Sequence, residues 1–425
     1  MNDIRALFDF IKKSTSAFLT VKTVKDELIE NEYTELLEGE PFSLSEGGKY
    51  FITKNSSSLI AFRYKADARG FMLVASHSDS PSFRLKSSVE RSNKYTVCDT
   101  EKYGGMLYYS WLDRPLSVSG RVLVRTEGGV EERLVDIDKD LFVIPSLAIH
   151  LNRSVNSELK LNPAVDLLPL SASGEKRGTL LTLIADAAGV TAERVISHDL
   201  FLYVREEGRV FGTDGEFISA PRIDDLASVY ASTTAFLNAT DSESIPVLAI
   251  FDNEEVGSET KQGALSSFLF DTISELGGKS YKKMLKNSLM VSADNAHAIH
   301  PNHPELSDPE NAPLLNGGVV IKHNANQRYA TDAPAEALFT EICNGAGVKL
   351  QSYYNRADIV GGSTLGSIAT TKLPVTTIDI GLPQLAMHSA VETAGAHDTA
   401  EMVKALTAFY SSSIEKDRTA YKIIK

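Results

Sequence analysis

Two adjacent acidic residues follow a short apolar run in the second half of this 425-residue chain. Residues 246–250 have the length and composition of a buried strand, and Glu254 and Glu255 come shortly after it. A carboxylate held at the end of a buried strand loses water, which is costly unless another group compensates. A metal ion would compensate, because one carboxylate can be its ligand while the other takes a proton from water. Two solvated acids that open the next segment are the alternative reading of the pair alone.

Three further apolar runs also end near histidine or acidic residues, and Asp224 precedes a helical pattern. In open α/β sheets, ligands bind at the carboxyl ends of the strands. Several such endings, all of metal-binding residue types, therefore indicate one shared metal site. The runs are 71–75, before His77 and Asp79; 288–291, before Asp294; and 375–380, before His388.

The order and the residues of these motifs resemble those of the aspartyl aminopeptidase family, and the resemblance runs from about Ser16 to the last helix. That family consists of exopeptidases with two zinc ions that assemble into tetrahedral dodecamers. The resemblance therefore implies a metallo-aminopeptidase that prefers N-terminal Asp or Glu and forms a homo-oligomer, with twelve chains expected. The matching segments are 76–81 (SHSDSP), 221–224 (PRID), 251–258 (FDNEEVGS), 292–294 (SAD) and 383–389 (PQLAMHS).

The resemblance also assigns the metal ligands. It implies that His77 and Asp294 bind one zinc ion and that Glu255 and His388 bind the other. Asp224 would bridge the two ions. Manganese or cobalt also suit carboxylate and imidazole ligands, so the residues leave the native metal open.

Two further acids have roles beside the metals. By the family pattern, Glu254 is the general base. Asp79 stands two residues after His77, and side chains at this spacing lie on the same face of an extended strand. We therefore expect the Asp79 carboxylate to accept the outer imidazole N–H of His77 and to fix its tautomer.

Four residues are expected at the substrate. Lys322 matches the lysine that the family places beside the acidic side chain of the substrate, and Tyr329 matches a pocket tyrosine. The resemblance places His297 near the active site. His150 matches a histidine that reaches the active site of a neighbouring subunit. A surface lysine and ordinary loop histidines are the structural alternatives.

The pattern of strands predicts a discontinuous fold. Residues 1–87 and 210–425 are expected to form a zinc-exopeptidase-like α/β/α sandwich, which is the catalytic domain. Residues 88–209 alternate in hydrophobicity and contribute no metal-type strand ending, so we expect an inserted β-rich domain. The resemblance gives this insertion a role in subunit contacts. The last helix should begin with Asp398 as its capping residue.

Composition restricts the partners. The net charge of −13 argues against nucleic acid, and no apolar run is long enough to span a bilayer. The two cysteines lie far apart in sequence, which fits a reducing compartment, so we expect a cytoplasmic enzyme that acts on peptides. Two alternatives stay open: another aminopeptidase or amidohydrolase with two metals and a different specificity, and a non-catalytic scaffold of the same fold.

Overall fold

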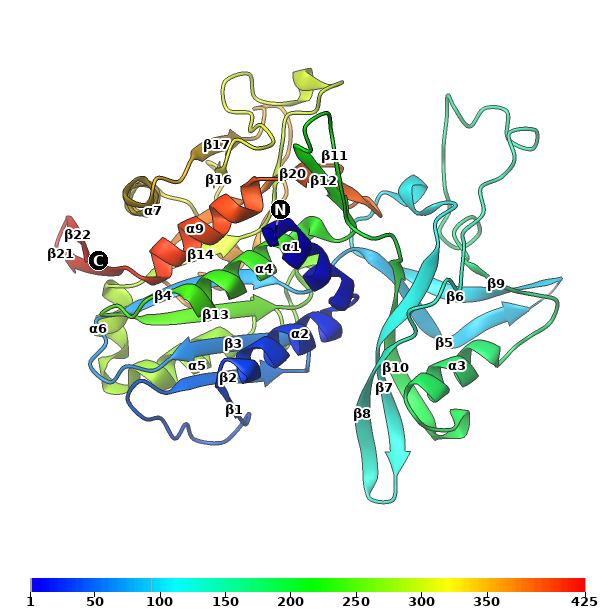
Figure 1. Cartoon of the computed structure of the whole chain (residues 1–425), viewed down its shortest axis with the longest axis horizontal. Coiled ribbons are helices and arrows are strands. Elements are labelled where there is room, and N and C mark those ends of the chain that lie inside the picture. The colour runs from blue at the N-terminus through cyan, green and yellow to red at the C-terminus, as the bar shows by residue number, and fades with distance from the viewer. Residues whose placement is uncertain (1, 93, 425) are drawn as a thin grey trace.

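The computed structural model describes residues 2–92 and 94–424, and its largest element is a nine-stranded mixed sheet (Figure 1). The strand order is β1-β2-β3-β13-β4-β14-β18-β16-β17. The four central strands β13, β4, β14 and β18 are parallel to one another, so their carboxyl ends lie along one edge. The strands are β1 Thr34–Leu36, β2 Lys49–Lys54, β3 Ser58–Arg63, β4 Phe71–His77, β13 Ile245–Phe251, β14 Leu289–Ala293, β16 Val319–His323, β17 Leu350–Tyr354 and β18 Thr376–Gly381.

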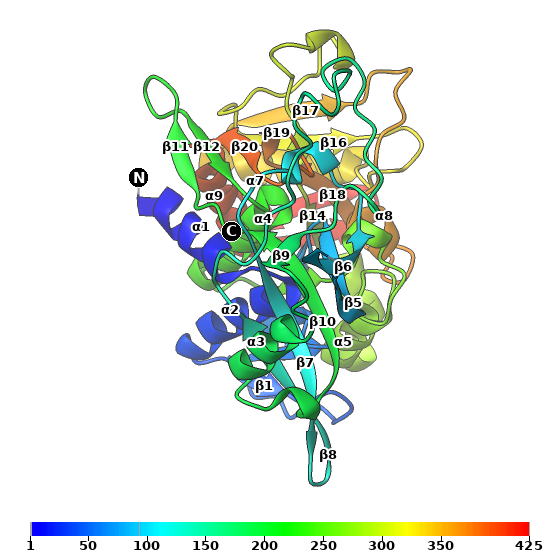
Figure 2. The same ribbon diagram turned by 90° about the vertical axis from the view of Figure 1, so that its right-hand side faces the viewer.

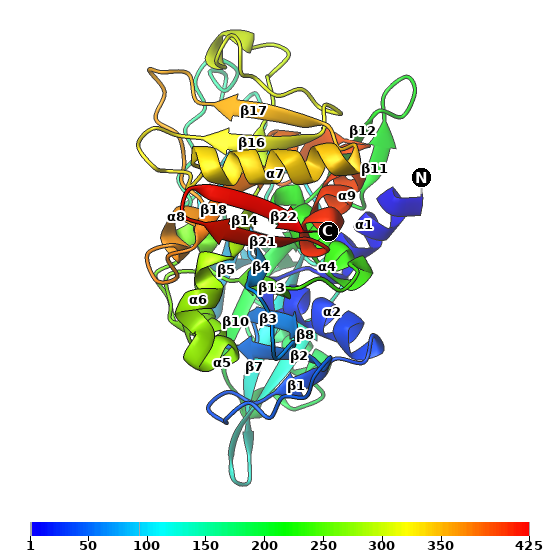
Figure 3. The same ribbon diagram turned by 90° about the vertical axis from the view of Figure 1, so that its left-hand side faces the viewer.

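Helices cover both faces of this sheet. Every residue of β4, β13 and β14 is buried, which agrees with apolar runs rather than alternating sequences. One face packs against α1 Asn2–Lys13, α2 Ala17–Glu30, α4 Ile223–Asn238, α7 Ala333–Ala346 and α9 Asp398–Tyr410. The other face packs against α5 Phe268–Gly277, α6 Tyr281–Lys286 and α8 Leu365–Ala369. Figure 3 shows α7 beside the C-terminal hairpin of β21 Ser413–Asp417 and β22 Ala420–Ile424.

A second, six-stranded sheet lies to one side of the sandwich and is seen in front in Figure 2. Its order is β8-β7-β10-β5-β6-β9, and every neighbouring pair is antiparallel. Helix α3 Thr179–Ala187 packs on it and shares its apolar core. The strands are β5 Ser82–Ser92, β6 Tyr95–Tyr103, β7 Leu116–Thr126, β8 Gly129–Asp136, β9 Leu170–Ser173 and β10 Val195–Val204.

A small five-stranded sheet lies beside the carboxyl edge of the central strands. Its order is β11-β12-β20-β19-β15, and it brings together segments from three parts of the chain. The strands are β11 Arg209–Phe211, β12 Phe217–Ala220, β15 Ala296–His297, β19 Pro383–Leu385 and β20 Glu392–Gly395. Within the described residues, no helix combines the length and apolar character needed to cross a bilayer.

The predicted α/β class with a helix-covered sheet and an added β-rich unit is confirmed. The domain limits stay a prediction, and β5 runs across the proposed boundary at residues 87 and 88. The predicted cap of the last helix is wrong. Helix α9 does begin at Asp398, but its carboxylate accepts hydrogen bonds from the backbone N–H groups of Asn316 and Gly318. The Asp398 carboxylate thus binds the backbone of a distant loop and does not cap its own helix.

Candidate active site

The predicted metal-binding residues meet at the carboxyl edge of the central parallel strands. His77 is the last residue of β4, Asp294 directly follows β14, and Glu254 and Glu255 lie in a short turn after β13. Strands β13 and β14 flank β4, so neighbouring strands deliver these side chains to one place. His388 comes from the loop between β19 and β20, and Asp224 comes from the start of α4.

Asp224 lies between the two histidines. Its Oδ1 is 3.6 Å from Nε2 of His77, and its Oδ2 is 3.7 Å from Nε2 of His388. The two oxygens of one carboxylate therefore face two different imidazoles, which is the arrangement that a bridging ligand requires.

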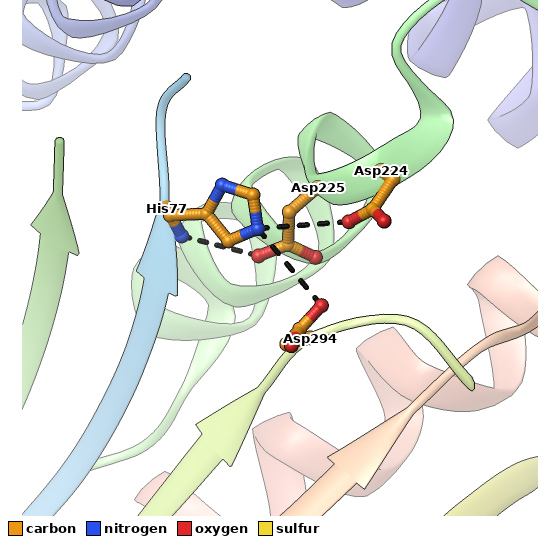
Figure 4. A group of neighbouring side chains, drawn as sticks. All are labelled: His77, Asp224, Asp225 and Asp294. Carbon is orange, nitrogen blue, oxygen red and sulfur yellow. Dashed lines mark hydrogen bonds and ion pairs between the residues drawn. The ribbon is translucent and has the colours of Figure 1, made fainter. Parts of the chain in front are cut away.

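Each histidine has one further carboxylate near its Nε2. Asp294 Oδ1 lies 3.9 Å from Nε2 of His77, as Figure 4 shows, and Glu255 Oε1 lies 3.3 Å from Nε2 of His388. Two half-sites result, His77 with Asp294 and His388 with Glu255, and both share Asp224. The grouping matches the ligand pairs expected from the sequence.

The tautomers of both histidines suit metal binding. Nδ1 of His77 lies 3.0 Å from the backbone carbonyl oxygen of Asp79, and Nδ1 of His388 lies 2.8 Å from that of Gly105. A carbonyl only accepts hydrogen bonds, so each Nδ1 carries a proton and, in the neutral ring that binds a metal, each Nε2 offers its lone pair. Both free lone pairs are on the nitrogens that face the carboxylates.

Unpartnered oxygens show that these residues fit metal ions. Asp224 Oδ1 and Glu255 Oε1 are buried and accept no hydrogen bond, although buried carboxylate oxygens are costly without a partner. Burial is the main cause that raises the pKa of Glu255 well above its usual value, and the Asp224 carboxylate adds to it. A divalent ion would supply the missing partner and reverse this shift.

Asp225 is a site residue that the sequence analysis did not recognise. Its side chain is fully buried, and its Oδ2 accepts the backbone N–H of His77 at 3.1 Å (Figure 4). Its Oδ1 has no hydrogen-bond partner, and the residue belongs to the same group of potential metal ligands as His77 and Asp294. The acidic doublet Asp224–Asp225 was the only sequence signal for it.

Asp79 acts differently from the expected contact. The nearest acceptor for Nδ1 of His77 is the backbone carbonyl of Asp79, while its carboxylate Oδ1 is 3.4 Å away. The carboxylate instead accepts the backbone N–H groups of Glu254 and Glu255, each at 3.2 Å. Asp79 therefore orients His77 through its main chain and holds the turn with the two glutamates through its side chain.

Glu254 stands beside the two half-sites and lines the same cavity as their residues. Burial raises its pKa to about 8, and the carboxylates of Asp294 and Asp79 contribute to the rise. A carboxyl group with a raised pKa is a better proton acceptor once ionised, as a general base requires.

Glu392 is a second residue that the sequence analysis missed. Its Oε2 accepts the backbone N–H of Asp224 at 2.9 Å, and its Oε1 accepts that of His388 at 2.8 Å. This single buried carboxylate therefore fixes the main chain of the bridging residue and of one histidine. The sequence offered no motif for it, because it lies in an ordinary short strand.

The cavity at the half-sites has a volume of about 310 Å³ and is also lined by Lys322, Tyr329 and His297. Lys322 is 2% exposed, and its Nζ donates to the backbone carbonyls of Asp294 and Asn295 at 2.7 and 3.2 Å. Tyr329 is buried, with its ring 5.2 Å from Nζ of Lys322. His297 is exposed on β15. All three thus line the cavity at the half-sites, and their contacts with a substrate stay a prediction.

His150 is a predicted site residue that the single chain does not bring to either the half-sites or this cavity. It is exposed in the long connection between β8 and β9 of the six-stranded sheet. Its expected action on a neighbouring subunit stays a prediction.

A second cavity, of about 320 Å³, lies between the two large sheets. Asp79 and Asp224 line it from the side of the metal-binding residues, and Tyr103 and Phe201 line it from the six-stranded sheet. The half-sites are therefore close to the contact between the sheets.

Comparisons with known proteins identify the family of this chain. The family model "Aminopeptidase I zinc metalloprotease (M18)" matches residues 10–410. The chain is 43% identical over 424 residues to a "Probable M18 family aminopeptidase 2" of Clostridium acetobutylicum, covering 96% of this chain and 98% of the relative.

Solved structures give the same assignment. An M18 aminopeptidase of Thermotoga maritima superposes with a TM-score of 0.84 at 25% identity, covering 96% of both chains. The Saccharomyces protein in a structure described as an "mApe1 dodecamer" gives a TM-score of 0.84 at 27% identity, covering 96% of this chain and 95% of that one. This chain belongs to the M18 family of zinc aminopeptidases.

Proposed function

We propose that this enzyme uses two zinc ions to remove N-terminal residues from peptides, with a preference for Asp and Glu. The observation that carries the two-ion proposal is the position of Asp224, whose two oxygens face the Nε2 atoms of His77 and His388 at 3.6 and 3.7 Å. A site for a single ion has no need of a carboxylate between two imidazoles. His77 and Asp294 would hold one ion, and His388 and Glu255 the other.

Two zinc ions at this site would polarise the scissile carbonyl and lower the pKa of a water molecule. Residues of the chain then transfer the proton and hold the base in place. Glu254 accepts the proton of the attacking water and passes it to the leaving amine. Asp79 accepts a hydrogen bond from the backbone N–H of Glu254, which fixes the position of the base relative to the reacting atoms. His77, Asp224 and Asp294 of the first half-site are buried, whereas His388 of the second is partly exposed.

Lys322 supports the preference for acidic residues. Within the described residues, it is the cation that lines the cavity at the half-sites. Although burial acts the other way, the Asp294 carboxylate holds the pKa of Lys322 above its usual value, so the side chain stays charged. A substrate carboxylate entering this cavity would meet that charge, beside the hydroxyl of Tyr329.

A second specificity has a specific observation in its favour. Nζ of Lys322 already donates to two backbone carbonyls and lies 3.4 Å from Asp294 Oδ2. A lysine that is occupied in this way could serve the metal ligand alone, and the enzyme would then prefer neutral N-terminal residues.

The proposal extends to assembly and location. The chain would form a homo-oligomer of twelve subunits, with contacts made by the six-stranded sheet and with His150 reaching a neighbouring site. The related Saccharomyces structure is described as a dodecamer, which supports this expectation. Buried, unpaired thiols at Cys98 and Cys343 are compatible with a cytoplasmic location.

A hydrolysis panel tests the function. Aminoacyl anilides of Asp, Glu, Leu and Ala are incubated with the purified protein, before and after a chelator removes its metals. We expect hydrolysis that is fastest for Asp and Glu, that the chelator abolishes, and that zinc, manganese or cobalt partly restores. A preference for Leu over Asp would support the second specificity, and full activity in a metal-free sample would contradict the metal-dependent mechanism.

A further inference from the structure

A short segment of the six-stranded sheet contacts the catalytic residues directly. It comprises the last residue of β6 and the four residues that follow it, and we call it the 103–107 segment. Its contacts are with Asp79, Glu255 and His388, all of which lie at the carboxyl edge of the other sheet.

Tyr103 reaches the turn that carries both glutamates. Its hydroxyl donates to Asp79 Oδ2 at 2.6 Å and accepts a hydrogen bond from the Asn253 side chain at 2.9 Å. The same Asp79 carboxylate holds the backbone N–H groups of Glu254 and Glu255. Tyr103 therefore fixes the acceptor on which the position of both glutamates depends.

The Tyr103 ring is anchored in its own sheet. It packs edge-on against Phe201 of β10, with 5.3 Å between the ring centroids. Loss of the hydroxyl alone should leave this ring contact in place. The phenol thus links a fixed point of the six-stranded sheet to the turn after β13.

The next residues of the segment hold His388. The carbonyl oxygen of Gly105 accepts from Nδ1 of His388 at 2.8 Å, and the backbone N–H of Leu107 donates to the His388 carbonyl at 3.0 Å. One of these bonds sets the tautomer of the imidazole, and the other sets the position of its main chain.

Gly104 allows the segment to approach closely. Its φ is +74°, and a Cβ added there would lie 3.2 Å from the Cβ of Glu255. A side chain at this position would therefore press on one of the two residues of the His388 half-site.

The two half-sites are held in different ways. Nδ1 of His77 bonds to Asp79, and Asp294 bonds to Lys322, so that half-site is held by the nine-stranded sheet and its loops. His388 makes two hydrogen bonds with the 103–107 segment, in addition to the one from its N–H to Glu392, and Glu255 lies next to Gly104. The His388 half-site is thus the one that the 103–107 segment contacts directly.

We propose that the 103–107 segment is a positioning element for the His388 half-site and for Glu254, with Tyr103 as its main positioning residue. This inference rests on the proposed two-metal function. It gives the six-stranded sheet a role in every active site that is separate from any role in assembly.

The first test compares two tyrosines of the same sheet. Tyr103→Phe removes the hydroxyl that binds Asp79, and Tyr203→Phe removes a hydroxyl that donates to Asp136 at 2.7 Å. Both variants lose a phenol–carboxylate hydrogen bond, but only the first bond leads to the half-sites. The zinc content per chain after dialysis against graded chelator is measured together with kcat, KM and the melting temperature.

We expect Tyr103→Phe to lose one zinc ion at a chelator concentration about 10-fold lower than wild type does. The value of kcat should also fall at least about 10-fold, because removing a group that orients metal ligands typically costs about 10- to 100-fold in metal affinity or activity. KM should change little, because substrate contacts are kept. Tyr203→Phe should lower the melting temperature similarly but keep wild-type zinc retention and kcat. Equal zinc retention and equal kcat in the two variants would overturn the proposal.

The second test compares two glycines with the same backbone angle. Gly104 and Gly174 both have φ of +74°, but a Cβ at Gly174 would meet no atom within 4 Å. The strain of an alanine at positive φ is therefore shared, and only Gly104→Ala adds the contact with Glu255. Gly104→Ala should lose one zinc ion more easily than Gly174→Ala, and equal retention would contradict the proposal even if Tyr103→Phe does not fold.

Failure of the two-metal function can be distinguished from failure of the positioning proposal by the zinc content of the wild-type chain. If the wild-type chain itself binds only one zinc ion, the two-metal mechanism is wrong. The positioning proposal is then decided by kcat and by retention of that ion in the same matched pairs.

Discussion

Nζ of Lys322 lies 3.4 Å from Asp294 Oδ2 and donates to the backbone carbonyl of Asp294 at 2.7 Å. The residue expected to select the substrate therefore also contacts an expected metal ligand. Although burial acts the other way, the Lys322 ammonium holds the pKa of Asp294 below its usual value. The carboxylate stays ionised and ready to bind a cation, so substrate preference and metal binding are linked at this pair.

Because Lys322 contacts Asp294, we expect Lys322→Met to lower kcat/KM in two ways. Methionine keeps most of the alkyl chain but removes the charge. The value of kcat/KM should fall for all substrates, because Asp294 loses a contact, and should fall further for Asp and Glu, because a charge shielded from water contributes more than an exposed one. Kinetics on Asp, Glu, Leu and Ala anilides measure both parts. A uniform fall would show that Lys322 serves only Asp294.

Glu254→Gln should remove the base and keep the metals. The amide has the same shape but cannot accept the proton, so kcat should fall by about 10²–10⁴-fold, the usual contribution of a general base. Zinc content should stay at the wild-type value. Glu259→Gln is the control, since Glu259 is an exposed residue of the same loop. If Glu254→Gln instead loses zinc, the roles of Glu254 and Glu255 are exchanged.

The metal-free enzyme should lose stability as the pH rises from about 5 to 8. In the folded state the pKa of Glu254 is raised to about 8, mainly by burial, so the folded chain holds a proton that the unfolded chain releases near the ordinary glutamate pKa of 4.5. This contribution is complete below the unfolded pKa and is lost as the pH passes the folded pKa. His77, whose pKa is also raised, acts in the same direction.

Melting temperatures of chelator-treated protein across this pH range measure the effect. Zinc-loaded protein should show a smaller decline, because bound cations keep the carboxylates ionised. Glu254→Gln should reduce the decline of the metal-free form, since the amide does not titrate. A metal-free protein that gains stability over the range, or an unchanged slope in the variant, would contradict the account.

His150 can be tested by mixing subunits. If it acts on a neighbouring site, His150→Ala chains and Glu254→Gln chains are each nearly inactive alone. Mixed assemblies should regain activity, because a Glu254→Gln chain supplies His150 to a neighbour with an intact base. Light scattering should show assemblies of about twelve chains. Mixed oligomers that stay inactive would show that His150 does not complement a neighbouring site.

Much of the site could be predicted because its residues follow buried parallel strands. The apolar runs before His77, Glu254 and Asp294 are readable in the sequence, and such strands end at one edge. The residues that were missed act through hydrogen bonds to distant segments of the chain. Tyr103 is 24 residues from Asp79, and Glu392 is 168 residues from Asp224, and neither contact has a periodic or spacing signature.

The cap predicted at Asp398 fails for a related reason. The local pattern suits a helix start, but the carboxylate accepts hydrogen bonds from N–H groups 82 and 80 residues away in the chain, at Asn316 and Gly318. Tertiary contacts decided which donors it accepts, and the local sequence carried no information about them.

The most direct test of the central claim is a zinc titration of the metal-free enzyme, with bound zinc per chain and Asp-anilide hydrolysis measured in the same samples. The account predicts that two ions bind per chain and that full activity requires the second ion, because Asp224 is placed to bridge the pair. Full activity at one bound ion, with no further ion taken up, would contradict it.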